Sequence, residues 1–270
     1  VAEVTYGGLD GNSKGNSDLF VVKYNSSGTK QWTKQLGTEE YDEARGVATD
    51  SSGNVYVVGG TKGRLNGISN SGRTDVFMIK FNSSGTRQWT KPLGTVQNDL
   101  ANGVSIDSSG NVYVAGVTYK NLDGNTSAGS ADLFVAKYNS SGTKQWTKQL
   151  GTSGRDHARG VATDSSGNVF VVGDTYGGLD GNTNAGYNDL FVVKYNSSGT
   201  KQWTKQLGTS STDLADGVAT DSSGNAYVVG YTYGGLDGNT NTGGSDLFVV
   251  KYNSSGTKQW TKQLGSSSQN

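Results

Sequence analysis

Residues 189–208 of the chain read DLFVVKYNSSGTKQWTKQLG. Near copies of this stretch begin at four other aspartates, Asp18, Asp75, Asp132 and Asp246. The five tryptophans recur in these copies at a constant spacing of 57 residues, at Trp32, Trp89, Trp146, Trp203 and Trp260. A repeat of this length is one supersecondary unit that cannot bury its apolar face alone, so the copies must stack on one another to form a core. The period therefore predicts one continuous repeat domain.

One repeat reads as four short strands that form two hairpins. The first hairpin spans residues 160–173 with the turn SSGN in its middle, and the second spans residues 189–207 with the turn NSSG. In both turns glycine supplies a left-handed residue. β-branched and aromatic residues dominate all four runs, and no window shows the 3.6-residue period of a helix. We therefore expect essentially no helix.

Four antiparallel strands in each repeat indicate an all-β fold, a β-propeller whose blades run from a central channel to the rim. The inner strand is then the short run GVATD, and the outer strand carries the tryptophan. The second hairpin occurs five times and the first only four times, so we predict five blades, one of which lacks its inner strand. The expected single domain has a partial blade at residues 1–37 and blades at 38–94, 95–151, 152–208 and 209–270.

The missing inner strand leaves two alternatives to a five-bladed ring. The chain is a fragment of a longer array of blades, or it is an open array that takes the missing strand from another copy. The second alternative gives head-to-tail assembly, because a heterologous contact that does not close propagates.

The run GVATDSSGNVYVVG at residues 46–59, with near copies from 103, 160 and 217, resembles the first hairpin of NHL-type bacterial propeller repeats. The full unit, which includes DLFVVKYNSSG, resembles the SBBP beta-propeller repeats of bacterial surface and secreted proteins. The resemblance covers nearly the whole chain. It implies an extracellular or cell-surface location and a binding or scaffold role, but no particular ligand, because propellers host unrelated activities.

Composition argues against several classes of function. The 23 Lys and Arg residues balance the 23 Asp and Glu residues, so no global field attracts nucleic acid or an anionic membrane surface. No stretch approaches the roughly 20 apolar residues that a membrane-spanning helix needs. The absence of cysteine removes disulfides, thiolate nucleophiles and Cys-based zinc sites. We expect neither nucleic-acid binding nor membrane insertion.

Strand direction alternates, so the tight turns share one face of the propeller and the longer loops share the other, which we call the long-loop face. Variable residues collect there, where a ligand would be met. One set is the tyrosines that begin the long loops, Tyr6, Tyr119, Tyr176 and Tyr233. A second is the aspartates of the outer-to-inner loops, Asp42, Asp99, Asp156 and Asp213. A third should ring the channel mouth, just before each inner strand: Arg45, Asn102, Arg159 and Asp216.

Each of these sets also has a structural interpretation. The tyrosines can pack over the neighbouring blade. The aspartates can anchor their loops through hydrogen bonds to backbone amides. The channel residues can surround nothing but water.

Four long loops carry Leu-Asp-Gly-Asn and then a polar run into another aspartate. Alternating carboxylate and amide oxygens resemble the 1-3-5 ligand spacing of calcium loops. The match is imperfect, because no glutamate follows and Asn66 replaces the first aspartate in the second copy; plain turn formation is the alternative. The candidate calcium ligands are Asp10, Asp123, Asn125, Asp180, Asn182, Asn184, Asp189, Asp237, Asn239, Asn241 and Asp246. No other cofactor is expected.

The sequence does not favour an enzyme. His157 is the only histidine, and we expect it to be a solvated loop residue with no partner for metal or nucleophile chemistry. We predict instead a secreted or surface binding module, with multivalent carbohydrate recognition by repeated Tyr/Asp/Asn pockets on the long-loop face. The alternative is a structural or adhesive scaffold that self-associates head to tail through the missing inner strand and has no small ligand.

Overall fold

The computed structural model describes residues 1–9 and 13–267, and nearly every regular element in them is a strand. Five antiparallel sheets follow one another along the chain, one for each repeat. The strands of the first two sheets are β1 (Ala2–Thr5), β2 (Asp18–Tyr24) and β3 (Lys30–Leu36), then β4 (Asp42–Thr49), β5 (Val55–Thr61), β6 (Asp75–Phe81) and β7 (Arg87–Leu93). The third sheet has β8 (Asp99–Ile106), β9 (Val112–Thr118), β10 (Asp132–Tyr138) and β11 (Lys144–Leu150). The last two have β12 (Asp156–Thr163), β13 (Val169–Thr175), β14 (Asp189–Tyr195) and β15 (Lys201–Leu207), then β16 (Asp213–Thr220), β17 (Ala226–Thr232), β18 (Asp246–Tyr252) and β19 (Lys258–Leu264).

The first sheet has three strands and each of the others has four, which confirms the predicted five blades with one inner strand missing. The helices of residues 1–9 and 13–267 are three single 3-10 turns in the long loops: η1 (Leu65–Gly67), η2 (Leu179–Gly181) and η3 (Leu236–Gly238). None of them has the length or apolar character to cross a membrane.

Each inner strand begins earlier than the sequence predicts and contains a β-bulge. In β4 the strand starts at Asp42 rather than Gly46, because Asp42 already pairs with Thr61 of β5. Pairing then skips Arg45, which is the bulged residue. The equivalent bulged residues of the other inner strands are Asn102, Arg159 and Asp216. A β-bulge re-aims the side chain of its extra residue, and these four residues are the ones that the strand pairing omits.

Adjacent blades pack face to face through one apolar layer, which we call a junction. At the junction of the fourth and fifth blades the fourth contributes Phe170, Val172, Leu190, Val192 and Trp203. The fifth contributes Ala215, Val228, Leu236, Phe248, Val250 and Tyr252. Trp203 lies at the outer end of the layer, with its ring centroid 6.3 Å from that of Tyr252. The repeated tryptophans therefore help to join one blade to the next.

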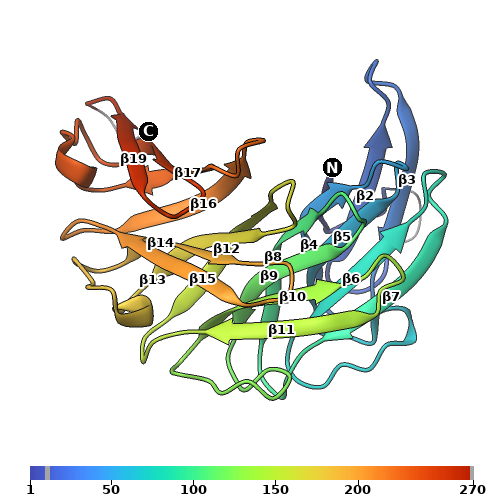
Figure 1. Cartoon of the computed structure of the whole chain (residues 1–270). Helices are drawn as coiled ribbons and strands as arrows, with labels where there is room; N and C mark the ends of the chain where they lie inside the picture. The colour runs from blue at the N-terminus through green and yellow to red at the C-terminus, as the bar shows by residue number, and fades with distance from the viewer. Residues whose placement is uncertain (10–12, 268–270) are drawn as a thin grey trace.

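The five blades form an open arc. The inner strands β4, β8, β12 and β16 contact one another in chain order around the axis. Figure 1 shows the first blade, in blue, and the last blade, in red, at separate ends of this arc. Each end blade therefore has one face that no neighbouring blade covers in the part of the chain that the structure describes.

Candidate functional site

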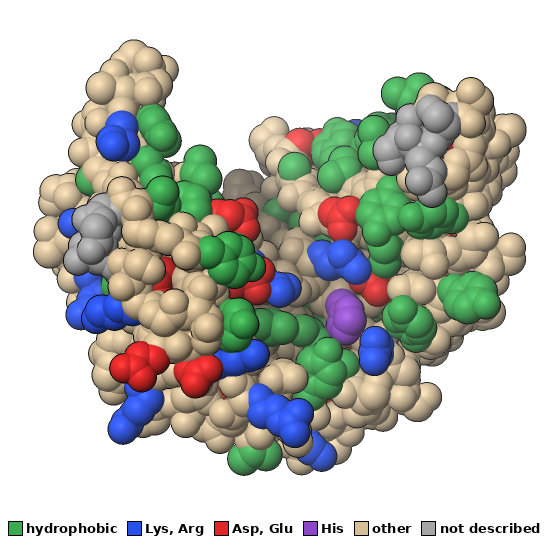
Figure 2. Space-filling model, turned by 180° about the vertical axis from the view of Figure 1, so that it is seen from behind, with side chains coloured by type: hydrophobic (Ala, Val, Ile, Leu, Met, Phe, Trp, Pro, Cys, Tyr) green, Lys and Arg blue, Asp and Glu red, His purple; other side chains and the backbone are tan. Residues whose placement is uncertain are grey.

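A pocket of about 390 Å³ lies on the long-loop face, around the axis of the arc. Its lining residues are Arg45, Leu100, Asn102, Val117, Tyr119, His157, Arg159 and Asp216. Figure 2 shows this face of the molecule hollowed at its centre, with the histidine beside basic and acidic side chains. The fold thus brings the four predicted channel-mouth residues into one pocket, together with one of the predicted tyrosines.

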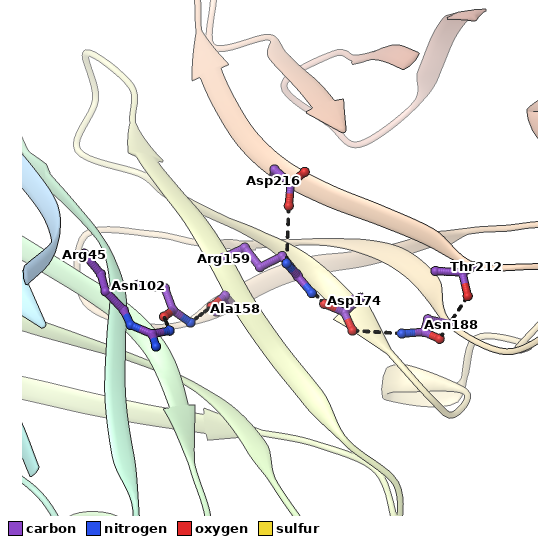
Figure 3. A network of polar contacts seen from close by, with 8 residues as sticks. All are labelled: Arg45, Asn102, Ala158, Arg159, Asp174, Asn188, Thr212 and Asp216. Atoms are coloured by element: carbon purple, nitrogen blue, oxygen red, sulfur yellow. Dashed lines mark hydrogen bonds and ion pairs between the residues drawn. The ribbon is translucent and has the colours of Figure 1, made fainter. Parts of the chain in front are cut away.

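Arg159 is the centre of a charged network on one side of the pocket (Figure 3). Its Nε donates a hydrogen bond to Asp174 Oδ1 at 2.6 Å, and its Nη1 lies 3.4 Å from Asp216 Oδ1. Asp174 is buried, and its Oδ2 accepts a hydrogen bond from the Asn188 amide at 3.1 Å. Burial disfavours the charge on Arg159, but the hydrogen bond and charge of Asp174 outweigh it and raise the pKa of the guanidinium. Arg159 is therefore a fixed, permanently charged donor.

Arg45 and Asn102 form the other side of the pocket. Arg45 Nη1 donates to Asn102 Oδ1 at 3.1 Å, and its Nη2 lies 3.0 Å from Glu43 Oε2. Asn102 Nδ2 in turn donates to the Ala158 carbonyl at 2.8 Å, which links the third blade to the fourth (Figure 3). The Asn102 amide is held at both ends, so its orientation is set before any ligand arrives.

Three positions of otherwise similar strands differ from blade to blade around this pocket. The second residue of the inner strand is Glu43, Leu100, His157 or Leu214. The bulged residue is Arg45, Asn102, Arg159 or Asp216. The sixth residue of the second strand is Gly60, Val117, Asp174 or Tyr231. The repeats therefore build one asymmetric pocket and not several equivalent ones.

His157 is not the solvated loop residue that the sequence predicted. It lies in β12 opposite Asp174, and its Nε2 is buried with no hydrogen-bond partner among the described residues. Burial lowers the pKa of the imidazole, against the opposing charge of Asp174. The prediction failed because the inner strand begins before His157, at Asp156.

Sequence reasoning missed His157, which lines the pocket, and Asp174, whose buried carboxylate holds Arg159 there. A signal was available, because both occupy strand positions that change between nearly identical repeats. The second strand ends in VVGGT, VAGVT, VVGDT or VVGYT, so only its fourth and sixth residues vary there.

The second predicted set, Asp42, Asp99, Asp156 and Asp213, does not face a ligand. All four are fully buried at the first position of an inner strand. Asp156 Oδ1 accepts a hydrogen bond from the Thr175 hydroxyl, and its Oδ2 accepts one from the Thr152 backbone N–H at 2.6 Å. The prediction that these carboxylates bind ligand is wrong, because all four are buried and accept hydrogen bonds from their own loops. Asp42, Asp156 and Asp213 also anchor the loop to the second strand, which was the alternative interpretation. Asp99 Oδ1 is buried without a hydrogen-bond partner among the described residues.

The tyrosines that begin the long loops do not act alike. Tyr119 lines the axial pocket. Tyr6, Tyr176 and Tyr233 are exposed on the surface, and the Tyr233 ring meets the Tyr231 ring edge-on at 5.9 Å. Since their aspartate partners are buried, the structure does not assemble the repeated Tyr/Asp/Asn pocket.

The long-loop residues predicted as calcium ligands point to different partners. Asp180, at a positive φ of 56°, forms an ion pair with Lys201. Asn182 Nδ2 donates to the Leu179 carbonyl at 2.8 Å. The homologous aspartates and amides make corresponding bonds: Asp123 with Lys144, Asp237 with Lys258, Asn125 with Leu122 and Asn239 with Leu236.

The remaining candidate ligands are also engaged elsewhere. Asn184 and Asn241 each accept a backbone N–H two residues ahead. Asp189 Oδ2 accepts hydrogen bonds from Ala185 N and Gln206 Nε2, and Asp246 accepts from Thr242 N and Gln263 Nε2. Residues 1–9 and 13–267 contain no group of three or more acidic, histidine or cysteine residues placed to hold a metal ion. The candidate calcium-ligating side chains in these residues therefore do not gather around a common point. Asp10 lies outside the described residues.

Comparison with known proteins gives matches along most of the chain. The SBBP family model, described as a beta-propeller repeat, matches residues 31–66, 88–123, 145–180 and 202–237, which together exceed half of the chain. An uncharacterized WD repeat-containing protein of Acanthamoeba polyphaga mimivirus is 25% identical over 89% of this chain and 24% of its own length. The regulatory protein FlaEY of Caulobacter vibrioides is 27% identical over 61% of this chain and 19% of its own length. The chain spans less than a quarter of either curated relative.

Two solved structures resemble the chain at low sequence identity. A protein of unknown function from Bacteroides caccae superposes with a TM-score of 0.45 at 12% identity, over 92% of this chain and 74% of the other. A gluconolactonase from Xanthomonas campestris superposes with a TM-score of 0.48 at 13% identity, over 92% of this chain and 72% of the other.

Proposed function

The chain belongs to the SBBP beta-propeller repeat family, and on that premise we propose that it is a non-enzymatic binding module for a small neutral carbohydrate. The binding site is the axial pocket of the long-loop face. The observation that carries the proposal is the divergence of the repeats, because their strands differ most at three positions, and seven of the twelve residues at these positions line this one pocket.

The lining of the pocket suits a polyhydroxylated ligand. Its volume of about 390 Å³ falls in the range of roughly 300–1,000 Å³ that small-molecule sites occupy. Tyr119, Leu100 and Val117 offer aromatic and aliphatic surface to sugar C–H groups. Asn102, Arg159 and Asp216 offer donors and acceptors to hydroxyl groups.

The pairing of charges favours a neutral ligand over an ionic one. Arg45 is paired with Glu43, and Arg159 is shared by Asp174 and Asp216. A strongly charged ligand that takes Arg159 from Asp174 would leave the buried Asp174 carboxylate without compensation. A sugar hydroxyl can join the same network without displacing any charge.

The same contacts support binding without catalysis. No serine, threonine or cysteine lines the pocket among the described residues. His157 Nε2 has no hydrogen-bond partner there, whereas an activated nucleophile needs a base within hydrogen-bond reach. Both nearby carboxylates, Asp174 and Asp216, contact Arg159, so neither is free to serve as a general acid.

A secreted or surface-associated location is part of this proposal and is supported by the resemblance to repeats of bacterial surface proteins. The alternative, a self-associating scaffold without a small ligand, depends on the ends of the arc and not on the pocket.

Two matched tyrosine variants test the proposal. The probes are an array of neutral mono- and disaccharides, followed by calorimetric titration with the sugars that bind. We expect Tyr119→Ala to weaken binding about tenfold or more, because it removes the aromatic wall, and Tyr176→Ala to leave affinity unchanged. Asn102→Ala should weaken binding as well. Equal losses from both tyrosine variants would overturn the single pocket in favour of repeated sites, and no binding to any sugar would overturn the carbohydrate proposal.

A further inference from the structure

A second pocket adjoins the axial pocket on the long-loop face. We call it the outer pocket, and its volume is about 560 Å³. It lies where the long loop of the second blade meets the third blade, and its lining residues are Glu40, Lys62, Arg73, Thr74, Asn98 and Leu100. Leu100 lines the axial pocket as well, so the two pockets are neighbours that share one side chain.

Gly60 gives Leu100 its place between the two pockets. A Cβ added to Gly60 would lie 2.5 Å from Leu100 Cδ2 and 3.0 Å from Thr74 Cγ2. The Leu100 side chain therefore lies directly over the glycine, beside Thr74. The other complete blades carry a larger residue at this position: Val117, Asp174 or Tyr231. The small residue of the second blade thus makes room for Leu100 as a wall common to both pockets.

The outer pocket differs from the axial pocket in its charges. Lys62 and Arg73 provide two cations, and Glu40 provides one carboxylate. None of the three takes part in an ion pair within residues 1–9 and 13–267. Lys62 Nζ lies 4.6 Å from the centroid of the Tyr41 ring, which attracts the ammonium group. An anion can therefore bind Lys62 and Arg73 without displacing a carboxylate, which the axial pocket does not allow at Arg159.

The two cations are specific to the second blade. Lys62 stands where the other long loops have a tyrosine: Tyr6, Tyr119, Tyr176 and Tyr233. Arg73 stands where they have an uncharged residue: Asn16, Ser130, Tyr187 and Gly244. Figure 2 shows several basic side chains on this face around the central hollow. The divergence that marks the axial pocket thus continues into the outer pocket, where it adds positive charge.

We propose that the outer pocket binds a sugar unit that carries a carboxylate, and that one ligand spans both pockets. The inference rests on the proposed function, because the neutral unit of the same ligand occupies the axial pocket. The planar guanidinium of Arg73 matches the geometry of a carboxylate, and the Lys62 ammonium adds a point charge. Asn98 offers an amide donor and acceptor to the hydroxyl groups of the sugar ring. The ligand class is therefore an oligosaccharide that joins a neutral hexose to a hexuronate.

Glu40 weakens this preference for an anion. Its carboxylate lines the same pocket and repels an anionic group there, so the lining has a surplus of one positive charge. Glu40, Lys62 and Arg73 are all exposed, and salt screens exposed charges. Affinity for the acidic ligand should therefore fall as ionic strength rises from about 0.05 to 0.5 M, whereas affinity for a neutral ligand should not change.

Calorimetric titration with matched ligands tests the proposal. The ligands are hexose–hexuronate disaccharides of several linkages and their methyl esters, which keep nearly the same shape without the charge. We expect the acid to bind about tenfold tighter than the ester. Arg73→Gln and Lys62→Gln should each reduce this difference and leave affinity for the ester unchanged, and Glu40→Gln should tighten binding of the acid alone. Arg87→Gln is the matched control, since Arg87 is an exposed arginine at the start of β7 that lines neither pocket.

Tyr119→Ala separates failure of this inference from failure of the proposed function. It should weaken binding of the acid and of the ester, since both place their neutral unit in the axial pocket. Equal affinity for acid and ester, with both dependent on Tyr119, would overturn the outer pocket and leave the proposed function standing. A preference for the acid that survives Arg73→Gln combined with Lys62→Gln, or acid binding that does not depend on Tyr119, would overturn the spanning ligand. Failure of both disaccharides while simple neutral sugars bind would overturn this inference alone, and no binding of any sugar would overturn both.

Discussion

Replacement of Gly199 with alanine tests whether the tryptophan layer holds neighbouring blades together. Gly199 closes a tight turn at a φ of +81°, and a Cβ added there would lie 2.9 Å from Cδ2 of Trp146 in the preceding blade. Gly167 closes the other tight turn of the same blade at a φ of +74°, and a Cβ there would lie 3.5 Å from the nearest atom, an ordinary contact. Gly167→Ala is therefore the matched control.

Both substitutions strain a left-handed turn backbone, and only Gly199→Ala also crowds the indole ring. A left-handed backbone costs an alanine roughly 1–2 kcal/mol relative to glycine at either position. At Gly199 the methyl group must also displace the indole ring or the blade, and overpacking of this kind costs roughly 1–3 kcal/mol. We therefore expect a loss of about 1–2 kcal/mol for Gly167→Ala and about 2–5 kcal/mol for Gly199→Ala.

Equilibrium unfolding in urea measures both losses. Tryptophan fluorescence and far-UV circular dichroism should be followed together, because coincident transitions justify a single free energy of unfolding for the array. Equal destabilisation by the two variants would refute the reasoning, since it would mean that the contact between the turn and Trp146 contributes nothing.

Three further predictions concern other contacts. Asp156→Ala removes the acceptor for the Thr152 N–H and the Thr175 hydroxyl, so it should lower the free energy of unfolding by about 2–5 kcal/mol in a urea titration; a loss comparable to that of an exposed aspartate would contradict the anchoring role. Burial lowers the pKa of His157, so below about pH 6.5 the unfolded chain binds a proton at this residue more tightly than the folded chain does. The wild type should therefore lose stability on acidification relative to His157→Leu. Parallel profiles of thermal midpoint against pH for the two proteins would show that folding does not shift the pKa of the imidazole. Gln206→Leu removes the hydrogen bonds that hold the long loop at Leu179 N and Gly177 O, so amide hydrogen exchange of residues 177–188 should accelerate. Unchanged exchange would show that the loop does not depend on these two hydrogen bonds.

The repeat period predicted most of the fold because its signals are local. The turns SSGN and NSSG each need a left-handed glycine, as at Gly167 and Gly199, and they delimit the strands on both sides. The start of the inner strand was missed for a physical reason. Asp156 reads as a polar loop residue, but it is buried because Thr175 and Thr152 satisfy its carboxylate, and sequence alone does not show such long-range pairing.

The pocket could be predicted only in part. Arg45, Asn102, Arg159 and Asp216 were found because they differ between repeats just before the strand core. His157 and Asp174 were missed because both fall outside the predicted hairpin of residues 160–173, whereas β12 begins at Asp156 and β13 extends to Thr175. Their position near the axis depends on the β-bulge in β12 and on the arrangement of the blades around the axis, and both are properties of the assembled array.

The ring signals of His157 in an NMR spectrum test the central claim, that the repeats build one axial binding pocket. His157 is the only histidine of the chain and it lines the pocket, so its imidazole reports on that site alone. We predict that the signals shift to saturation as a neutral sugar selected on the array is added, and that Tyr119→Ala weakens this response. A sugar that binds the protein while the His157 signals stay unchanged would contradict the account.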